Sequence, residues 1–267
     1  MPPPDPAPDP APEGLPTLRI DGAVATVCLR RPSRRNSLAD EDLQALLAAI
    51  AAVDAEPQVR VLVLAADTQG QPKPVFSAGY DLGGLGADGA GPQLFERIPD
   101  ALEAARPVTV CALNGSVFGG ATDLALACDL RLALAGSVWR MPACALGLHY
   151  YPSGLRRYAA RFGIDLAKRA FLTAQPLPVE VLAAHGLFEA VVPGSDFDAA
   201  LDALVQQAAA LAPLAAQATK RSLNEIAAGR YDEPALRARE RLTQRSGDFA
   251  EGRAAFAERR APRFRGV

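Results

Sequence analysis

The apolar positions along the chain predict strands and helices in alternation up to about residue 196, and helices alone after it. Two runs of strand type, over 18–20 and 23–29, flank Asp21-Gly22, which is a strong signal for a two-residue hairpin turn. A polar segment over 30–38 follows. A helix is then predicted over 39–54, because Leu43, Leu46, Leu47 and Ile50 share one face.

Further apolar runs predict a sheet that is covered on both faces. The run Val61-Leu-Val-Leu-Ala65 is continuous and apolar, as in a strand with helices on either side. From Phe197 onward, apolar residues recur at helical spacing through three or four helices. Between these segments, helices are expected near 93–105, 155–162, 165–172 and 177–185, and strands near 108–110, 130–134, 138–141 and 190–192.

The stretch over 112–129 carries the strongest local signal for chemistry. Gly115 ends a β-branched run, and Gly119-Gly120 allow a sharp bend before small and apolar residues at helical spacing. Such a turn leaves backbone N–H groups unpaired at the positive end of a helix dipole, where an oxyanion can be stabilised. Asp123 lies in the first turn of this helix, where the dipole alone would also favour a carboxylate.

Composition narrows the class of protein. The 267 residues are 49% hydrophobic and 22% charged, as in an ordinary globular enzyme, and the net charge of −2 gives no reason to expect nucleic acid as a partner. No apolar run suggests a membrane span and no secretory signal is recognisable, so we expect a cytoplasmic protein. Two histidines give no support for a metal site. The cysteines lack a CxxC pair and are expected to be small buried hydrophobes: Cys28, Cys111, Cys128 and Cys144.

The chain is expected to divide into three parts. Residues 1–14 form a Pro-, Ala- and Asp-rich tract with nothing to bury, and a disordered tail is expected there. Residues 15–194 are expected to form an α/β core and residues 195–267 a helical region. The glycine-rich stretch at 83–91 is expected to be a mobile loop.

Four motifs in a fixed order resemble the enoyl-CoA hydratase/isomerase family, also called the crotonase superfamily, over about residues 17–265. Each motif alone is weak, but the four in this order make the resemblance strong. The motifs are Arg31-Pro-Ser-Arg-Arg-Asn-Ser-Leu38, Phe76-Ser-Ala-Gly-Tyr-Asp-Leu82, Asn114-Gly-Ser-Val-Phe-Gly-Gly120 with Cys128-Asp129, and the loop from Pro142 to Gly154.

This resemblance implies a crotonase-like spiral of ββα turns followed by a C-terminal helical region used for trimerisation. A homotrimer or a dimer of trimers is therefore expected. The resemblance also implies an acyl-CoA thioester as substrate, so that coenzyme A enters with the substrate and no separate cofactor is expected. Neither nucleic acid nor a membrane is expected as a partner. The loop at 83–91 would border the acyl pocket.

By motif position, the backbone N–H groups of Tyr80 and Gly120 resemble the pair that holds the thioester oxygen in this family. Two fixed donors stabilise the charge that develops on this oxygen when the thioester becomes an enolate, and one donor can contribute about 3 kcal/mol. These two residues are the predicted oxyanion hole.

The remaining binding residues follow from the same motifs. The adenine is expected against the backbone at Ser77 and Ala78, and Asp81 is a further candidate for substrate binding. Arg34 and Arg35 can reach phosphates, for which a guanidinium fork is suited; plain surface charge is an equally good interpretation.

The chain departs from the hydratase pattern at one of two carboxylates. The first position holds Asp123, one methylene shorter than the glutamate of hydratases, and the second aligns with Ala143, which cannot transfer a proton. Nearby, Tyr150 lies where the methylmalonyl-CoA decarboxylase branch has a functional tyrosine, although that branch has histidine at the position of Tyr80. His149 could titrate near neutral pH or, like Tyr151, simply line the acyl pocket.

Three hypotheses remain open from the sequence. The first is C=C isomerisation or hydration with Asp123 as the proton-handling group. The second is decarboxylation or a related cleavage of a malonyl-type thioester, for which Tyr150 and Ala143 are the motives. The third is a protein that binds acyl-CoA and has lost chemistry, for which Ala143 is the motive.

Overall fold

The computed structural model describes residues 13–81, 83 and 90–267. Most of the predicted tail and most of the glycine-rich loop lie outside these residues. The predicted tail boundary is nevertheless wrong at its inner end. Gly14 begins the first strand and pairs with Arg30, and the Glu13 carboxylate accepts a hydrogen bond from the Ser33 N–H at 2.9 Å.

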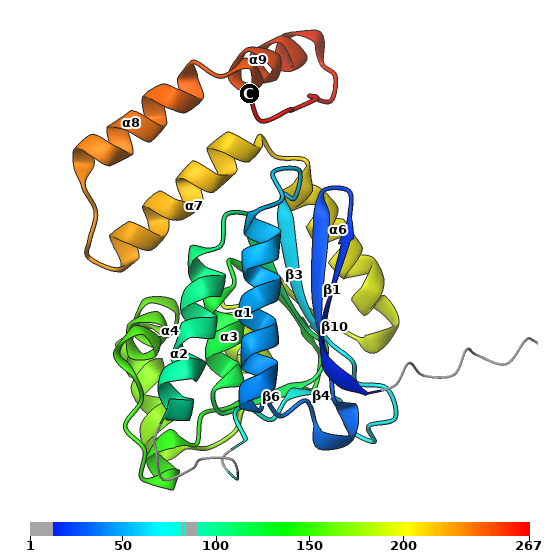
Figure 1. Ribbon diagram of the computed structural model, residues 1–267, viewed down its shortest axis with the longest axis vertical. Helices are drawn as coiled ribbons and strands as arrows, with labels where there is room; N and C mark the ends of the chain where they lie inside the picture. The colour runs from blue at the N-terminus through cyan, green and yellow to red at the C-terminus, as the bar shows by residue number, and fades with distance from the viewer. Residues whose placement is uncertain (1–12, 82, 84–89) are drawn as a thin grey trace, which may run out of the picture.

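A six-stranded sheet forms the centre of the molecule (Figure 1). The predicted hairpin at Asp21-Gly22 is confirmed: its two strands are antiparallel and Gly22 has a φ of +56°. All later strands of this sheet pair in parallel. In spatial order the strands are β1 (Gly14–Asp21), β2 (Val24–Arg30), β3 (Val61–Ala66), β5 (Val108–Leu113), β7 (Leu130–Leu134) and β10 (Ala190–Val192).

Helices cover this sheet on both faces, as the apolar run at 61–65 predicts (Figure 1). One face packs on α1 (Asp40–Asp54), α2 (Ala90–Ala104) and α3 (Ala121–Ala127). The opposite face packs on α6 (Phe197–Ala209), which buries Phe197 and Val205 against valines of β3 and β5. Apolar side chains buried on both faces explain why the central strands do not alternate polar and apolar residues.

A second, four-stranded sheet lies at the lower end of the first in Figure 1, where β4 and β6 are labelled. The sequence predicts β8 but not the short strands β4, β6 and β9, because two or three residues carry too little periodicity. Its strands, in order, are β4 (Val75–Ser77), β6 (Ser116–Phe118), β8 (Val138–Arg140) and β9 (Leu177–Pro178).

The helix α4 (Pro152–Thr173) contains the two helices predicted at 155–162 and 165–172. They are joined at Gly163, whose φ of +71° breaks the helical geometry. The short helix α5 (Val179–Ala184) then leads to β10. After α6, the chain continues as α7 (Pro213–Ala227), α8 (Glu233–Gln244) and α9 (Gly247–Glu258), which extend away from the core in Figure 1. Four helices therefore follow residue 196, as predicted.

The first of these extended helices is fixed to the core by polar contacts. Lys220 of α7 forms an ion pair with Asp129 at 2.8 Å and donates to the Pro107 carbonyl at 2.8 Å. Asn224 donates to the Glu103 carbonyl at 2.9 Å. Within the described residues, no single helix is both long and apolar enough to cross a membrane; α6 and α7 meet that limit only as a pair bent by 100°.

Candidate active site

The loop after β4 is held in place by the segment 35–38. The Ala78 N–H donates to the Arg35 carbonyl at 2.8 Å, and the Leu38 N–H donates to the Gly79 carbonyl at 2.9 Å. The buried Ser77 hydroxyl donates to the Asn36 carbonyl at 2.6 Å. Arg35 and Asn36 have φ values of +52° and +49°, which turn this segment toward the loop. The backbone at the predicted adenine position is thus ordered by contacts within the chain.

The Tyr80 N–H points away from this segment. Leu38 and Tyr80 form a parallel bridge in which the bonding partners are the Gly79 carbonyl and the Asp81 N–H, so that the Tyr80 N–H is directed to the other side. Among the residues that the structure describes, no acceptor contacts this N–H. Tyr80 therefore presents a backbone N–H with no acceptor among these residues. Its role in holding the thioester oxygen stays a prediction.

The turn between β6 and α3 lies directly against this loop. Gly119 adopts a φ of +56°, and Gly120 begins α3 with a backbone N–H that has no acceptor within residues 13–81, 83 and 90–267. A Cβ at position 79 would lie 2.7 Å from the Phe118 carbonyl oxygen and 3.0 Å from the Gly120 nitrogen. Only glycine at position 79 allows the two loops to approach so closely. Gly79 also has a φ of +89°, a conformation that favours glycine.

Aromatic rings form a wall beside these two donors. The Phe95 ring of α2 covers Gly120, since a Cβ at 120 would lie 2.7 Å from its Cε1. The Phe95 ring centroid is 6.0 Å from that of Tyr80 and 6.4 Å from that of Tyr151. Tyr151 stacks on the buried Tyr150 with ring centroids 4.1 Å apart. The surroundings of the Tyr80 and Gly120 N–H groups are thus aromatic.

Asp123 is completely buried, and its carboxylate has three side-chain donors. Arg157 of α4 donates to both oxygens, with Nε at 2.9 Å from Oδ1 and Nη2 at 2.6 Å from Oδ2. The Tyr151 hydroxyl donates to Oδ2 at 2.6 Å, and the Tyr150 hydroxyl donates to the Tyr151 oxygen at 3.0 Å. The side chains of Asp123 and Arg157 are both 0% exposed. The carboxylate is paired within the protein and is not presented to solvent.

The charges in this network keep its tyrosines neutral. Burial would lower the pKa of Arg157, but its hydrogen bonds to Asp123 and the attraction of that carboxylate outweigh burial and raise this pKa. Burial, followed by the Asp123 charge, raises the pKa of Tyr151 and of Tyr150 well above the ordinary phenol value. Neither hydroxyl is therefore suited to act as a base near neutral pH.

The other predicted residues lie at the edges of the site. The Tyr80 hydroxyl donates to Asp40 at 2.7 Å, and burial, then the Asp40 hydrogen bond, raises the pKa of Tyr80 to about 12. Asp81 accepts from the Gly83 N–H at 3.0 Å. Arg34 and Arg35 are exposed next to the loop at Ala78.

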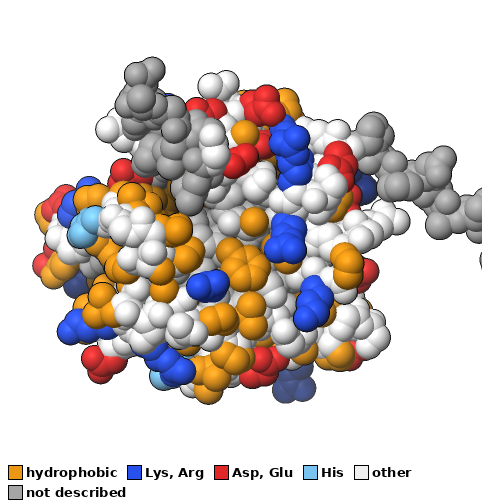
Figure 2. Space-filling view, turned by 90° about the horizontal axis from the view of Figure 1, so that it is seen from below, with side chains coloured by type: hydrophobic (Ala, Val, Ile, Leu, Met, Phe, Trp, Pro, Cys, Tyr) orange, Lys and Arg blue, Asp and Glu red, His pale blue; other side chains and the backbone are white. Residues whose placement is uncertain are grey.

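His149 and Cys144 are exposed and line a shallow groove of about 520 Å³ along α4. Figure 2 shows hydrophobic side chains gathered on this side of the molecule, where Leu146, Leu148, Ile164 and Leu172 are exposed. The expectation that all four cysteines are buried is wrong for Cys144, and Cys28 is partly exposed. Ala143 is buried.

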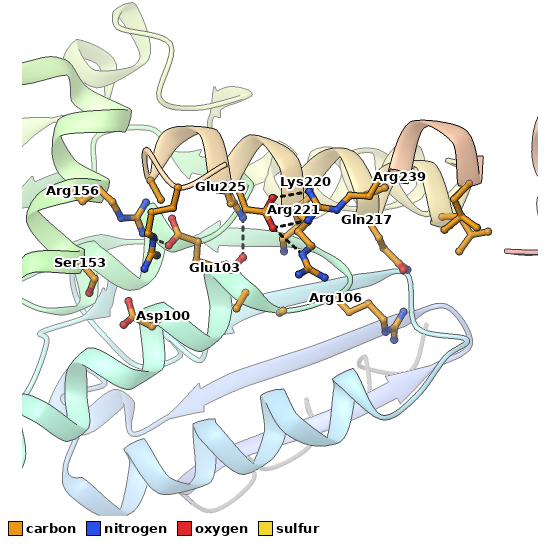
Figure 3. A pocket seen from close by; sticks show the side chains of 18 residues that line it. Asp100, Glu103, Arg106, Ser153, Arg156, Gln217, Lys220, Arg221, Glu225 and Arg239 are labelled. Atoms are coloured by element: carbon orange, nitrogen blue, oxygen red, sulfur yellow. Dashed lines mark hydrogen bonds and ion pairs between the residues drawn. The ribbon is translucent and has the colours of Figure 1, made fainter. Parts of the chain in front are cut away.

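A larger groove of about 920 Å³ lies between α2, α4 and α7 (Figure 3). It is lined by paired charges, among them Glu225 with Arg239 at 2.6 Å, and neither Tyr80 nor Gly120 lines it. Asp100 and Glu103 of α2 line this groove and also contact Arg157 from that side, at 2.7 and 3.4 Å. Within the described part of the chain, no cluster of His, Cys, Asp and Glu could hold a metal ion.

Sequence reasoning missed Arg157 and Phe95. A signal for Arg157 exists, because Gly154, Arg157, Tyr158 and Phe162 share one helical face and all four are buried. A charged residue on such a face requires a buried partner, and in the structure the fully buried Asp123 is that partner. For Phe95 no comparable signal exists, since its contact with Gly120 depends on how α2 packs on α3.

Comparisons with known proteins identify the family of this chain. The model of the enoyl-CoA hydratase/isomerase family matches residues 19–267. The chain is 32% identical to enoyl-CoA hydratase domain-containing protein 2, mitochondrial, of Bos taurus, over 91% of this chain and 84% of that protein. It is 26% identical to methylmalonyl-CoA decarboxylase of Escherichia coli, over 91% and 95%.

The crystal structure of an enoyl-CoA hydratase/isomerase family protein from Hyphomonas neptunium superposes with a TM-score of 0.86 at 26% identity, over 94% of this chain and 98% of that one. The spiral α/β core and the helical C-terminal region are those of the crotonase fold. The chain belongs to the enoyl-CoA hydratase/isomerase family.

Proposed function

We propose that this acyl-CoA enzyme binds the coenzyme A thioester of a malonyl-type acid and releases its free carboxylate as CO₂ through a thioester enolate. The thioester oxygen lies between the N–H groups of Tyr80 and Gly120. The observation that carries this proposal is the pairing of Asp123 with Arg157 and Tyr151, which engages both oxygens of this carboxylate.

The two backbone donors supply the electrostatic part of the reaction. Both N–H groups lack an acceptor in the described structure and belong to loops in direct backbone contact. A preorganised donor that meets charge developing on oxygen contributes about 3 kcal/mol to the barrier. Coenzyme A enters as part of the substrate and no further cofactor is needed.

Decarboxylation needs no base from the protein. The bond between the α-carbon and the carboxylate carbon breaks, its electron pair passes into the enolate, and CO₂ leaves. The enolate then takes one proton from water at the α-carbon. Hydration or isomerisation requires instead a group that accepts and returns a proton. Asp123 is fully buried and paired, and Ala143 has no proton to exchange.

The aromatic wall favours the same reaction. Tyr151 must donate to the Asp123 carboxylate, because a carboxylate only accepts. Tyr150 must then donate to Tyr151, since the Tyr151 proton is already used. Both hydroxyl protons are directed into the network and not toward the acyl pocket. A carboxylate placed there gains no hydrogen bond from these rings, and its charge is relieved when CO₂ forms.

The sequence also predicts isomerisation or hydration through Asp123, and the position of this carboxylate three residues after Gly120 favours that alternative. It stays a prediction. E. coli methylmalonyl-CoA decarboxylase is similar over nearly the whole chain, which supports the decarboxylase proposal.

A panel of thioesters in D₂O tests the proposal. Malonyl- and methylmalonyl-CoA are expected to yield CO₂ and an acyl-CoA with one deuterium per turnover at the α-carbon. Propionyl-CoA is expected to show no exchange at that carbon, because Asp123 is buried and paired with Arg157. Mass spectrometry measures both. Hydration or isomerisation of enoyl-CoA substrates without CO₂ release would support catalysis by Asp123, and tight binding without turnover would indicate a binding protein.

A second experiment tests the phosphate contacts. Arg34→Gln and Arg35→Gln are each expected to raise KM for the CoA thioester about fivefold, the effect of one charge-assisted hydrogen bond, with kcat unchanged. The corresponding pantetheine thioester lacks the nucleotide phosphates, so its KM should not change. Arg19→Gln, on the exposed hairpin, is the matched control. Equal effects on both thioesters would rule out the phosphate role.

A further inference from the structure

The buried polar network beside the donors has a defined direction. Arg157 holds Asp123 as an anion with two hydrogen bonds, Tyr151 donates to that anion, and Tyr150 donates to Tyr151. Each hydroxyl has a single proton, so the anionic state of Asp123 determines where both tyrosine protons point.

We propose that Arg157 is a positioning residue that fixes the direction of this hydrogen-bond chain and thereby keeps the Tyr150 hydroxyl from donating to the acyl carboxylate. The proposal rests on the proposed decarboxylation for its effect on rate, but the direction of the chain can be tested without any reaction.

The opposite direction requires one proton. If Asp123 binds a proton on Oδ2, this new O–H donates to the Tyr151 oxygen. The Tyr151 hydroxyl then donates to the Tyr150 oxygen. The Tyr150 hydroxyl keeps its proton but can now donate it to a group outside the network. The reversed chain would leave the Tyr150 O–H able to donate to the carboxylate of the proposed substrate. That donor stabilises the carboxylate more than the enolate, and decarboxylation becomes slower.

The observed geometry prevents this reversal. Arg157 Nη2 lies 2.6 Å from the oxygen that would have to bind the proton, and the whole pair is removed from solvent. Arg157 is itself held from its other side by Asp100 and Glu103 of α2, and Ser153 lies 3.4 Å from its Nη2.

The charged and titratable groups around Asp123 come from three segments. Arg157 and Tyr158 belong to α4, Tyr150 and Tyr151 precede it, and the two α2 carboxylates, Asp100 and Glu103, contact Asp123 only through Arg157. Tyr158 donates to Thr122 at 2.6 Å and does not join the chain. Arg157 is therefore the cation on which the charge of Asp123 depends in this part of the described structure.

Arg157→Met and Arg156→Met form a matched pair of variants. Arg156 is adjacent in sequence and forms an ion pair with Glu103, but it does not contact Asp123. From about pH 5 to about pH 8, kcat for malonyl-CoA should be flat in the wild type and in Arg156→Met. In Arg157→Met, which leaves Asp123 without its cation, it should fall about tenfold at the acid end and recover as pH rises. Adding Tyr150→Phe should remove this acid loss. A flat profile for Arg157→Met would overturn the proposal.

Infrared difference spectra give a readout that needs no turnover. The carboxylic acid C=O band of Asp123, assigned by its loss in Asp123→Asn, should be absent from the wild type over this pH range and present in Arg157→Met at its acid end. If Arg157→Met does not fold, the wild-type spectrum decides alone, because a protonated Asp123 there contradicts the proposal. If the infrared spectra are as expected but no CO₂ is released, the proposed decarboxylation is wrong. The role of Arg157 in fixing the direction of the hydrogen-bond chain would still hold.

Discussion

Gly79→Ala is expected to lower kcat at least about 100-fold, which is the loss found when one oxyanion donor is removed. The added Cβ would lie 2.7 Å from the Phe118 carbonyl oxygen and 3.0 Å from the Gly120 nitrogen, so the two loops must move apart. The N–H groups of Tyr80 and Gly120 would then no longer meet the one thioester oxygen that we propose lies between them. Steady-state kinetics measures the loss, and thermal unfolding shows whether the variant remains folded.

Gly136→Ala is the matched control for backbone strain. Gly136 has a φ of +77°, close to the +89° of Gly79, but a Cβ there meets nothing within 4 Å. This variant should lose about 1 kcal/mol of stability and no activity. If Gly79→Ala kept more than about a tenth of the wild-type kcat, the donors would not be those of Tyr80 and Gly120.

Arg157→Met is expected to destabilise the fold by about 3–5 kcal/mol, the cost of leaving a buried charge without its partner. Asp123 would retain a single side-chain donor, Tyr151. Asp123→Leu should cost less, because Arg157 would still contact Asp100 and Glu103. Denaturant unfolding measures both values.

The double variant Arg157→Met/Asp123→Leu separates the ion pair from simple packing. With both charges removed, its loss should be well below the sum of the two single losses. Additive losses would mean that the pair contributes nothing beyond the volume of its side chains.

The sequence predicts those parts of the fold that depend on local signals. Asp21-Gly22 predicts the hairpin, the apolar run at 61–65 predicts a strand covered on both sides, and local patterns predict the two helical segments at 155–162 and 165–172. The strand β6 has only three residues and exists because β4 and β8 pair with it. The hydrogen bonds that stabilise β6 come from strands distant in sequence, so a local sequence pattern does not predict it.

The candidate site divides in the same way. Glycine motifs predict where free N–H groups occur, because backbone conformation is a local property. The ion pairing of Asp123 does not depend on local sequence, because its partner Arg157 lies 34 residues further along the chain. A carboxylate identified from sequence as a proton carrier is, in three dimensions, one half of an ion pair. Sequence reasoning thus located the residue and could not determine its charge partner.

The contact between the loop of Gly79 and the turn of Gly120 has a consequence for how this enzyme can change. Both proposed donors belong to the main chain, so replacing a side chain at Tyr80 leaves the N–H group in place. New reactions can therefore arise by exchanging surrounding side chains, while the pair of N–H groups proposed to activate the thioester is inherited intact.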